Sequence, residues 1–130
     1  MTKSGSYKMT ASWADVPAWA ADTTGFPGSS LVGNGLRVQG NNSNATVTVA
    51  LPFSGGQAGP TQQARIMINN NFVVNGPQAV SVGSGTLTAT ASGLSLTDGD
   101  VVTVQVTCAA GFNGWESTVT AGVGTYVRIT

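Results

Sequence analysis

Charged residues make up only 8% of this 130-residue chain, and histidine is absent. Soluble domains usually carry a charged fraction of roughly 25%. General acid/base, nucleophilic and metal-assisted catalysis draw mainly on clusters of His, Cys, Asp, Glu and Lys. We therefore expect a protein that is not an enzyme, with no cofactor, no catalytic residues and no metal site.

The chain also lacks net charge, a pair of cysteines and any long apolar run. Five Lys and Arg residues balance five Asp and Glu residues, so no basic stripe is available to bind phosphates or anionic lipid. Cys108 is the single cysteine, so it cannot form an intrachain disulfide, and we expect it in the core. No segment resembles a secretory signal or a transmembrane helix. We expect no nucleic acid and no membrane partner, and synthesis in a cytoplasm.

In place of charge, Thr, Ser, Asn, Gln and Gly alternate with Val, Leu, Ile and Ala. Short alternating runs broken by Gly, Asn, Pro or Asp are typical of antiparallel sandwiches and barrels. The runs predict strands at 36–38, 46–51, 64–68, 72–74, 79–82, 86–91, 101–108, 117–120 and 125–130. Several strands with one buried and one wet face favour an all-β, antiparallel jelly-roll sandwich.

Two turns are predicted from residues that tolerate left-handed backbone. The tract Asn69-Asn70-Asn71 separates two apolar runs, and Asn adopts this conformation more readily than other residues with side chains. Gly99 in the run 97–100 is free to take a positive φ before the strand that begins at Val101. Asp98 and Asp100 beside it could offer oxygens to calcium, but the full calcium-loop pattern is missing, so a plain turn is favoured.

The first 31 residues lack clean alternation and predict an extended N-terminal arm, followed by a jelly-roll domain over 32–130. The arm contains Trp13, Val16 and Trp19, and prolines disfavour a long helix there. Large aromatic side chains anchor many protein interfaces. We therefore expect Trp13, Val16 and Trp19 to bind a partner or a sister subunit, with sugar contact and simple core burial as alternatives.

A second aromatic group lies in the run Gly111-Phe112-Asn113-Gly114-Trp115. The flat face of a Trp can stack on a sugar ring while Asn bonds the hydroxyls. Phe112, Asn113 and Trp115 are therefore a candidate glycan-binding group, and core burial is the alternative interpretation.

Three segments resemble known proteins: ASWADV at 11–16 with Trp19, LSLTDGDVVTV at 94–104, and GTYVRI at 124–129. Together they resemble small virion proteins of tailed bacteriophages that infect actinobacteria. The run from Leu96 to Val104 and the final aromatic strand are also similar to the trimeric jelly rolls of the tumour-necrosis-factor and complement-globular-head type. The resemblance covers most of the chain.

The resemblance implies a head decoration protein or a minor tail protein, located in the virion after synthesis in the host cytoplasm. We expect a non-enzymatic structural protein, a homotrimer that binds the assembled capsid surface through the major capsid protein and stabilises it. A minor tail protein bound to tail proteins, or an adhesin module that binds a host-surface glycan, is the alternative.

Overall fold

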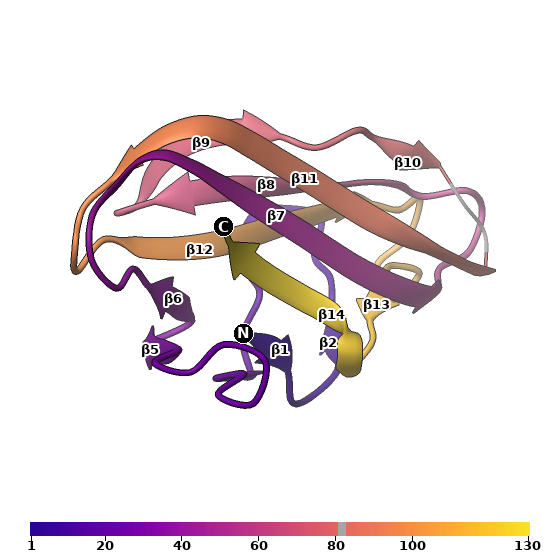
Figure 1. Ribbon diagram of the computed structural model, residues 1–130. Helices are drawn as coiled ribbons and strands as arrows, with labels where there is room; N and C mark the ends of the chain where they lie inside the picture. Colours follow the sequence, from indigo (N-terminus) through magenta and orange to yellow (C-terminus); the bar gives the residue numbers. More distant parts are fainter. Residues whose placement is uncertain (81–82) are drawn as a thin grey trace.

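Two antiparallel β-sheets pack face to face in the computed structural model, which describes residues 1–80 and 83–130. No helix occurs within those ranges. Figure 1 shows the long strands crossing the molecule, with both chain ends on the same side. The structure confirms the predicted antiparallel jelly-roll sandwich.

Sheet A is built around the long strand β7, which pairs with β11 along one edge and with β14 and β13 along the other. The N-terminal segment adds β1, β4 and β2 to the same sheet. The strands of sheet A are β1 (Thr2–Lys3), β2 (Tyr7–Lys8), β4 (Trp19–Ala20), β7 (Asn42–Gly55), β11 (Gly83–Leu96), β13 (Ser117–Val119) and β14 (Gly122–Ile129).

Sheet B is centred on the pair formed by β8 and β12, with β9 and β10 beside β8 and with β6 and β3 beside β12. Strand β5 closes the far edge against β6. The strands of sheet B are β3 (Ala14–Asp15), β5 (Ser30–Val32), β6 (Gly35–Arg37), β8 (Thr61–Ile68), β9 (Asn71–Asn75), β10 (Ala79–Val80) and β12 (Val101–Ala109).

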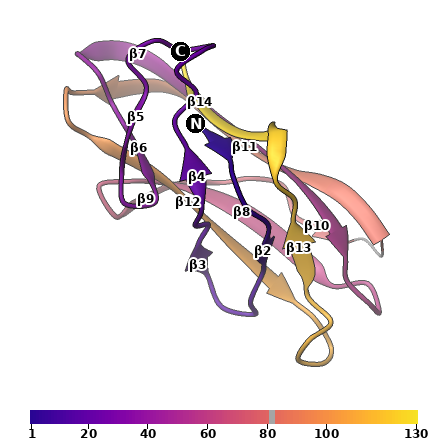
Figure 2. The same cartoon turned by 90° about the horizontal axis from the view of Figure 1, so that it is seen from below.

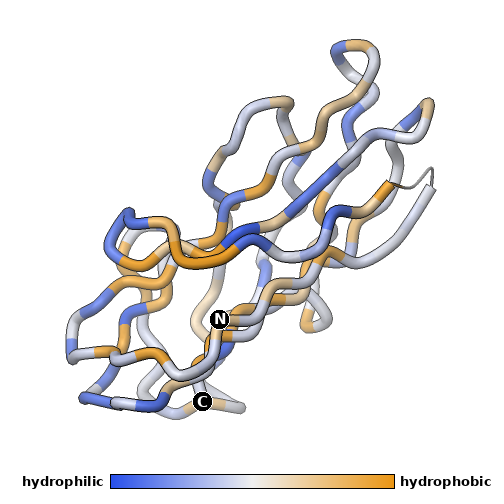
Figure 3. Tube along the Cα trace, turned by 90° about the horizontal axis from the view of Figure 1, so that it is seen from above, coloured by the Kyte–Doolittle hydropathy of each residue, from blue (hydrophilic) through white to orange (hydrophobic). Residues whose placement is uncertain are grey.

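The core lies between the inward faces of the two sheets and follows the predicted alternation. In β12 the inward residues are fully buried and the residues between them are half-exposed, as the sequence predicts. The buried set on this strand is Val102, Val104, Val106 and Cys108. Much of the trace in Figure 3 is close to white, which reflects the Thr, Ser and Gly that replace charge on the outside. Burial of apolar area, at roughly 25 cal/mol per Å², is the main stabilising force.

The first 31 residues are extended, as expected, but they do not project from the sandwich. Strand β1 lies between β14 and β4 in sheet A, whereas β3 extends sheet B beside β12. In Figure 2, β1 lies beside β14 and β3 lies beside β12. Met1, Met9, Val16 and Trp19 are core residues. The structure therefore corrects the expected division at residue 31, because the segment supplies strands and core to the same sandwich.

Both predicted turns are confirmed. Asn69 and Asn70 have φ angles of 50° and 63°, which are left-handed values, and Gly99 has a φ of 93°. The predicted strand 79–82 is found at Ala79–Val80, and residues 81–82 lie outside the described part of the chain. The strands β7 and β11 are longer than expected, since pairing with each other extends both across their polar ends.

Candidate functional site

The outward face of the three long strands of sheet A is almost free of charge. Strands β7, β11 and β14 contain one charged side chain in total, that of Arg128. Their outward positions carry small hydroxylated or apolar residues, many of them half-exposed or exposed. The outward residues at the centre of this face are Thr46, Thr48, Ala50, Pro52, Thr86, Thr88, Thr90 and Tyr126. A broad uncharged surface of this kind loses little solvation energy when another protein covers it.

Arg128 is held at the border of this face by two aromatic rings. Its guanidinium carbon lies 4.0 Å from the centroid of Tyr126 and 5.6 Å from that of Phe26. Tyr126 and Arg128 are two residues apart in β14, so their side chains leave the same side of the strand. Stacking of this type stabilises the cation by roughly 0.5–1 kcal/mol at exposed positions.

The outward face of sheet B has a different character, because three of its strands bring charged and amide groups together. Arg65 lies 4.3 Å from the Trp13 ring centroid and donates from Nε to Gln105 Oε1 at 2.8 Å. Gln105 in turn donates to Asp15 Oδ1 at 2.9 Å. The half-exposed Trp13 therefore lies on an ordered polar surface, with its ring orientation fixed by Arg65.

Trp13, Val16 and Trp19 were expected to act together, but the structure separates them. Val16 is completely buried, and Trp19 is 8% exposed with its indole Nε1 donating to the Val16 carbonyl at 2.6 Å. Both side chains contribute to the core of their own domain, so neither presents an anchor to a partner in this structure. Trp13 alone retains an accessible ring.

Lys3 is a buried cation next to Trp19, with only 3% of its surface exposed. Its ammonium group lies 5.8 Å from the Trp19 ring centroid and donates to the carbonyl oxygens of Gly5 and Ala18. Loss of water around the ammonium lowers the pKa of Lys3 below its ordinary value. These contacts tie the side chain of β1 to the backbone at Gly5 and Ala18, which indicates a structural role.

The candidate glycan-binding group lies in the loop between β12 and β13, at the end of the sandwich opposite the cavity described below (Figure 2). Phe112 is 66% exposed, and its ring centroid lies 4.6 Å from that of Trp115 at an angle of 60°. Phe112 and Asn113 line a groove of about 640 Å³ together with Lys8 and Glu116. The structure thus brings Phe112, Asn113 and Trp115 together at the surface, and the rings are not in the core.

The loop that carries these residues is braced by hydrogen bonds around Gly114. Lys8 Nζ donates to the Gly114 carbonyl at 2.6 Å, and the Gly114 amide donates to Glu116 Oε2 at 2.8 Å. The Gln57 amide donates to the Trp115 carbonyl at 3.0 Å. A loop fixed in this way loses less conformational freedom when a ligand binds.

Asp98 and Asp100 form the predicted turn. Asp98 pairs with Arg37 at 3.1 Å, whereas Asp100 accepts hydrogen bonds from the Thr97 amide and from Asn69 Nδ2, both at 2.8 Å. The bond from the Thr97 amide is the main cause that lowers the pKa of Asp100. Both carboxylates serve the fold here.

Within residues 1–80 and 83–130, no three His, Cys, Asp or Glu side chains lie close enough together to form a metal site. No helix in the same ranges is long and apolar enough to cross a membrane.

One cavity was not predicted from the sequence. A space of about 250 Å³ opens at the end of the sandwich near the two chain ends, between the loop 26–29 and the segment 37–42. Its apolar lining includes Met1, Phe26, Leu36 and other side chains from both sheets. Its residues come from parts of the chain that are far apart in sequence, so no local motif could have indicated it.

Comparison with known proteins identifies the fold. No protein-family model and no curated protein sequence matches the chain. Among solved structures, the chain is similar to the Eiger TNF from S. frugiperda, with a TM-score of 0.58 and 11% sequence identity. The alignment covers 98% of this chain and 89% of that chain. At this level of identity the likeness establishes a TNF-like jelly-roll fold and nothing about activity.

Proposed function

We propose that the protein is a non-enzymatic accessory protein of a tailed-phage virion, which binds the assembled capsid surface as a homotrimer. The virion assignment rests on the sequence resemblance of the segments 11–16, 94–104 and 124–129 to small phage virion proteins. The proposed subunit assembly rests on the outward face of sheet A, because β7, β11 and β14 contain only Arg128 as a charged residue.

This face fits subunit assembly because its association would bury few charges. Thr and Ala side chains can approach a neighbouring sheet closely, and Tyr126 adds a large ring of the type enriched at interfaces. A threefold arrangement closes on itself, so each subunit would use the same surfaces and leave none unpaired. Contacts between neighbouring trimers would then stabilise the shell.

Sheet B would face away from the trimer axis and meet the capsid. Trp13 is an accessible ring on this sheet, and it lies over the guanidinium of Arg65. Among the three arm residues expected to bind a partner, we keep Trp13 in this role and assign Val16 and Trp19 to the core. The partner is the major capsid protein, or a tail protein if the protein belongs to the tail.

A Trp13→Ala variant tests this placement. The ring is half-exposed, so its removal should leave the domain folded while it lowers occupancy on phage heads by roughly tenfold or more. Occupancy is measured by sedimentation with undecorated heads of a tailed phage that infects actinobacteria, and folding by the melting temperature. Phe112→Ala, which removes an exposed ring from the loop between β12 and β13, is the control and should leave occupancy unchanged. Equal occupancy of Trp13→Ala and wild type would reject the docking role.

A second candidate function is favoured by the loop 110–116. An exposed Phe112 paired with Trp115, with Asn113 beside them on a braced groove, matches the chemistry of a site that binds a sugar ring. In this alternative the protein is a minor tail protein or adhesin module that binds a host-surface glycan.

Trp115→Ala tests the alternative independently of assembly. If the loop binds a glycan, the variant should lose binding on a glycan array and keep its solution mass, because the loop lies away from the centre of sheet A. Trp13→Ala serves as the matched Trp control on the same array. Wild-type protein that binds no glycan would remove this candidate function.

A further inference from the structure

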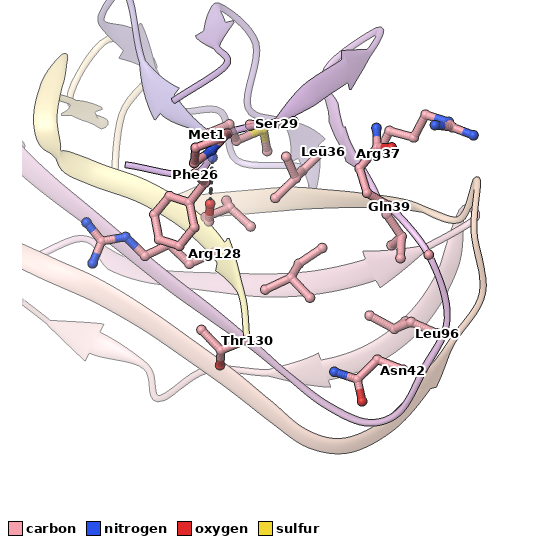
Figure 4. Close-up of a pocket in the computed structure, with 16 residues that line it drawn as sticks. Met1, Phe26, Ser29, Leu36, Arg37, Gln39, Asn42, Leu96, Arg128 and Thr130 are labelled. Atoms are coloured by element: carbon pink, nitrogen blue, oxygen red, sulfur yellow. Dashed lines mark hydrogen bonds between the residues drawn. The ribbon is translucent and has the colours of Figure 1, made fainter. Parts of the chain in front are cut away.

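Apolar side chains line much of the end cavity, and the two arginines in its wall point outward. In Figure 4, Phe26, Leu36 and Leu96 surround the space, while the guanidinium ends of Arg37 and Arg128 extend away from it. Its volume of about 250 Å³ exceeds the roughly 150 Å³ of an engineered apolar cavity that accepts benzene. The space therefore has room for a molecule of about ten non-hydrogen atoms.

Two buried hydrogen-bond donors in the cavity wall have no partner among the described residues. They are Ser29 Oγ and Arg128 Nε, and both residues line the cavity. Buried polar atoms without partners are uncommon in native proteins, because each one costs roughly 1–3 kcal/mol. Both atoms could donate to a molecule with hydrogen-bond acceptors bound in this cavity.

The charge of this site favours an anion. Arg37 is neutralised by Asp98, and that pair is the salt bridge found in the described part of the chain. Arg128 contacts the rings of Phe26 and Tyr126 instead of a carboxylate. A carboxylate bound by an Arg N–H forms a hydrogen bond roughly twice as strong as a neutral one.

We propose that the end cavity binds a small monocarboxylate with an apolar body. Its carboxylate accepts hydrogen bonds from Arg128 Nε and Ser29 Oγ, and its apolar body lies against Phe26, Leu36 and Leu96. This site is independent of the proposed virion role, because it involves neither Trp13 nor the loop 110–116.

Calorimetric titration with octanoate tests the proposal, with octylamine as a probe of the same length and opposite charge. We expect saturable binding of one octanoate per chain and no saturation with octylamine. Ser29→Ala and Arg128→Lys should each weaken octanoate binding by roughly five- to tenfold, since each removes one donor. Arg65→Lys, at an Arg outside the cavity, should leave binding unchanged.

A cavity-filling variant separates binding in this space from binding elsewhere. Leu96→Phe places a larger side chain in the cavity and should abolish octanoate binding. If Leu96→Phe fails to fold, Val38→Leu fills part of the same space with one added carbon and should weaken binding. Octanoate that does not saturate, equal binding of octylamine, or a folded Leu96→Phe protein that still binds octanoate would each overturn the proposal.

Discussion

Replacing Ala50 with Glu is expected to dissociate the proposed trimer without unfolding the subunit. Ala50 points outward from the middle of β7, and its backbone neighbours are Thr88 on β11 and Tyr126 on β14. A new carboxylate there has no cation directly opposite it, because Arg128 is paired with Thr48 and stacked on Tyr126, and it loses its water if the face is covered. A charge that is buried without a partner costs about 3 kcal/mol or more.

This cost corresponds to roughly a hundredfold loss in the association constant, or more. In an isolated subunit the same side chain stays in water, so the free energy of unfolding should change by less than about 0.5 kcal/mol. Thr103→Glu is the matched control, because Thr103 has the same half-exposed, outward position on the other sheet. It should leave the trimer intact.

Sedimentation velocity at low micromolar concentration distinguishes the outcomes. The wild type and Thr103→Glu should sediment as trimers, and Ala50→Glu as a folded monomer with an unchanged melting temperature. If Ala50→Glu sediments like the wild type, the outward face of sheet A is not the assembly surface. Dissociation by Thr103→Glu would assign assembly to sheet B instead.

Two further predictions concern the fold. Gly76→Ala should lower the free energy of unfolding by roughly 2 kcal/mol or more in urea titrations, because the added Cβ would lie 1.7 Å from the Thr88 carbonyl oxygen. Gly111→Ala, whose Cβ meets nothing within 4 Å, should stay within about 0.5 kcal/mol of wild type, and equal losses in both variants would contradict the packing argument. The hydrogen bond from the Thr97 amide lowers the pKa of Asp100 in the folded protein below 3.8. The ionised Asp100 carboxylate therefore stabilises the fold above pH 3.8, and this stabilisation is lost as the pH falls through the folded pKa. The stability difference between wild type and Asp100→Asn should therefore shrink on acidification, and a constant difference would refute the role of this hydrogen bond.

The sheet architecture could be predicted from the sequence because its signals are local. Alternation along 101–108 separates the buried face of β12 from the outer one within a few residues. The left-handed Asn69 and Asn70 reflect the intrinsic tolerance of Asn for that conformation. Phe112 and Trp115 are three residues apart, so their pairing in one loop was also accessible from the sequence.

The N-terminal segment could not be predicted in the same way. Its strands are only two residues long, and such short pieces carry no periodicity. Whether Val16 and Trp19 face a partner or their own core depends on where the segment docks, which is a tertiary property. The end cavity and the Trp13–Arg65 contact could not be predicted for the same reason. Each brings together residues that are distant in the chain.

The stoichiometry of binding to undecorated heads of a tailed phage that infects actinobacteria tests the central proposal most directly. Purified protein is titrated against heads and the bound fraction is measured after sedimentation. The proposed function predicts saturable binding with a bound copy number that is a multiple of three. Protein that remains in the supernatant at all concentrations would contradict binding to the capsid surface.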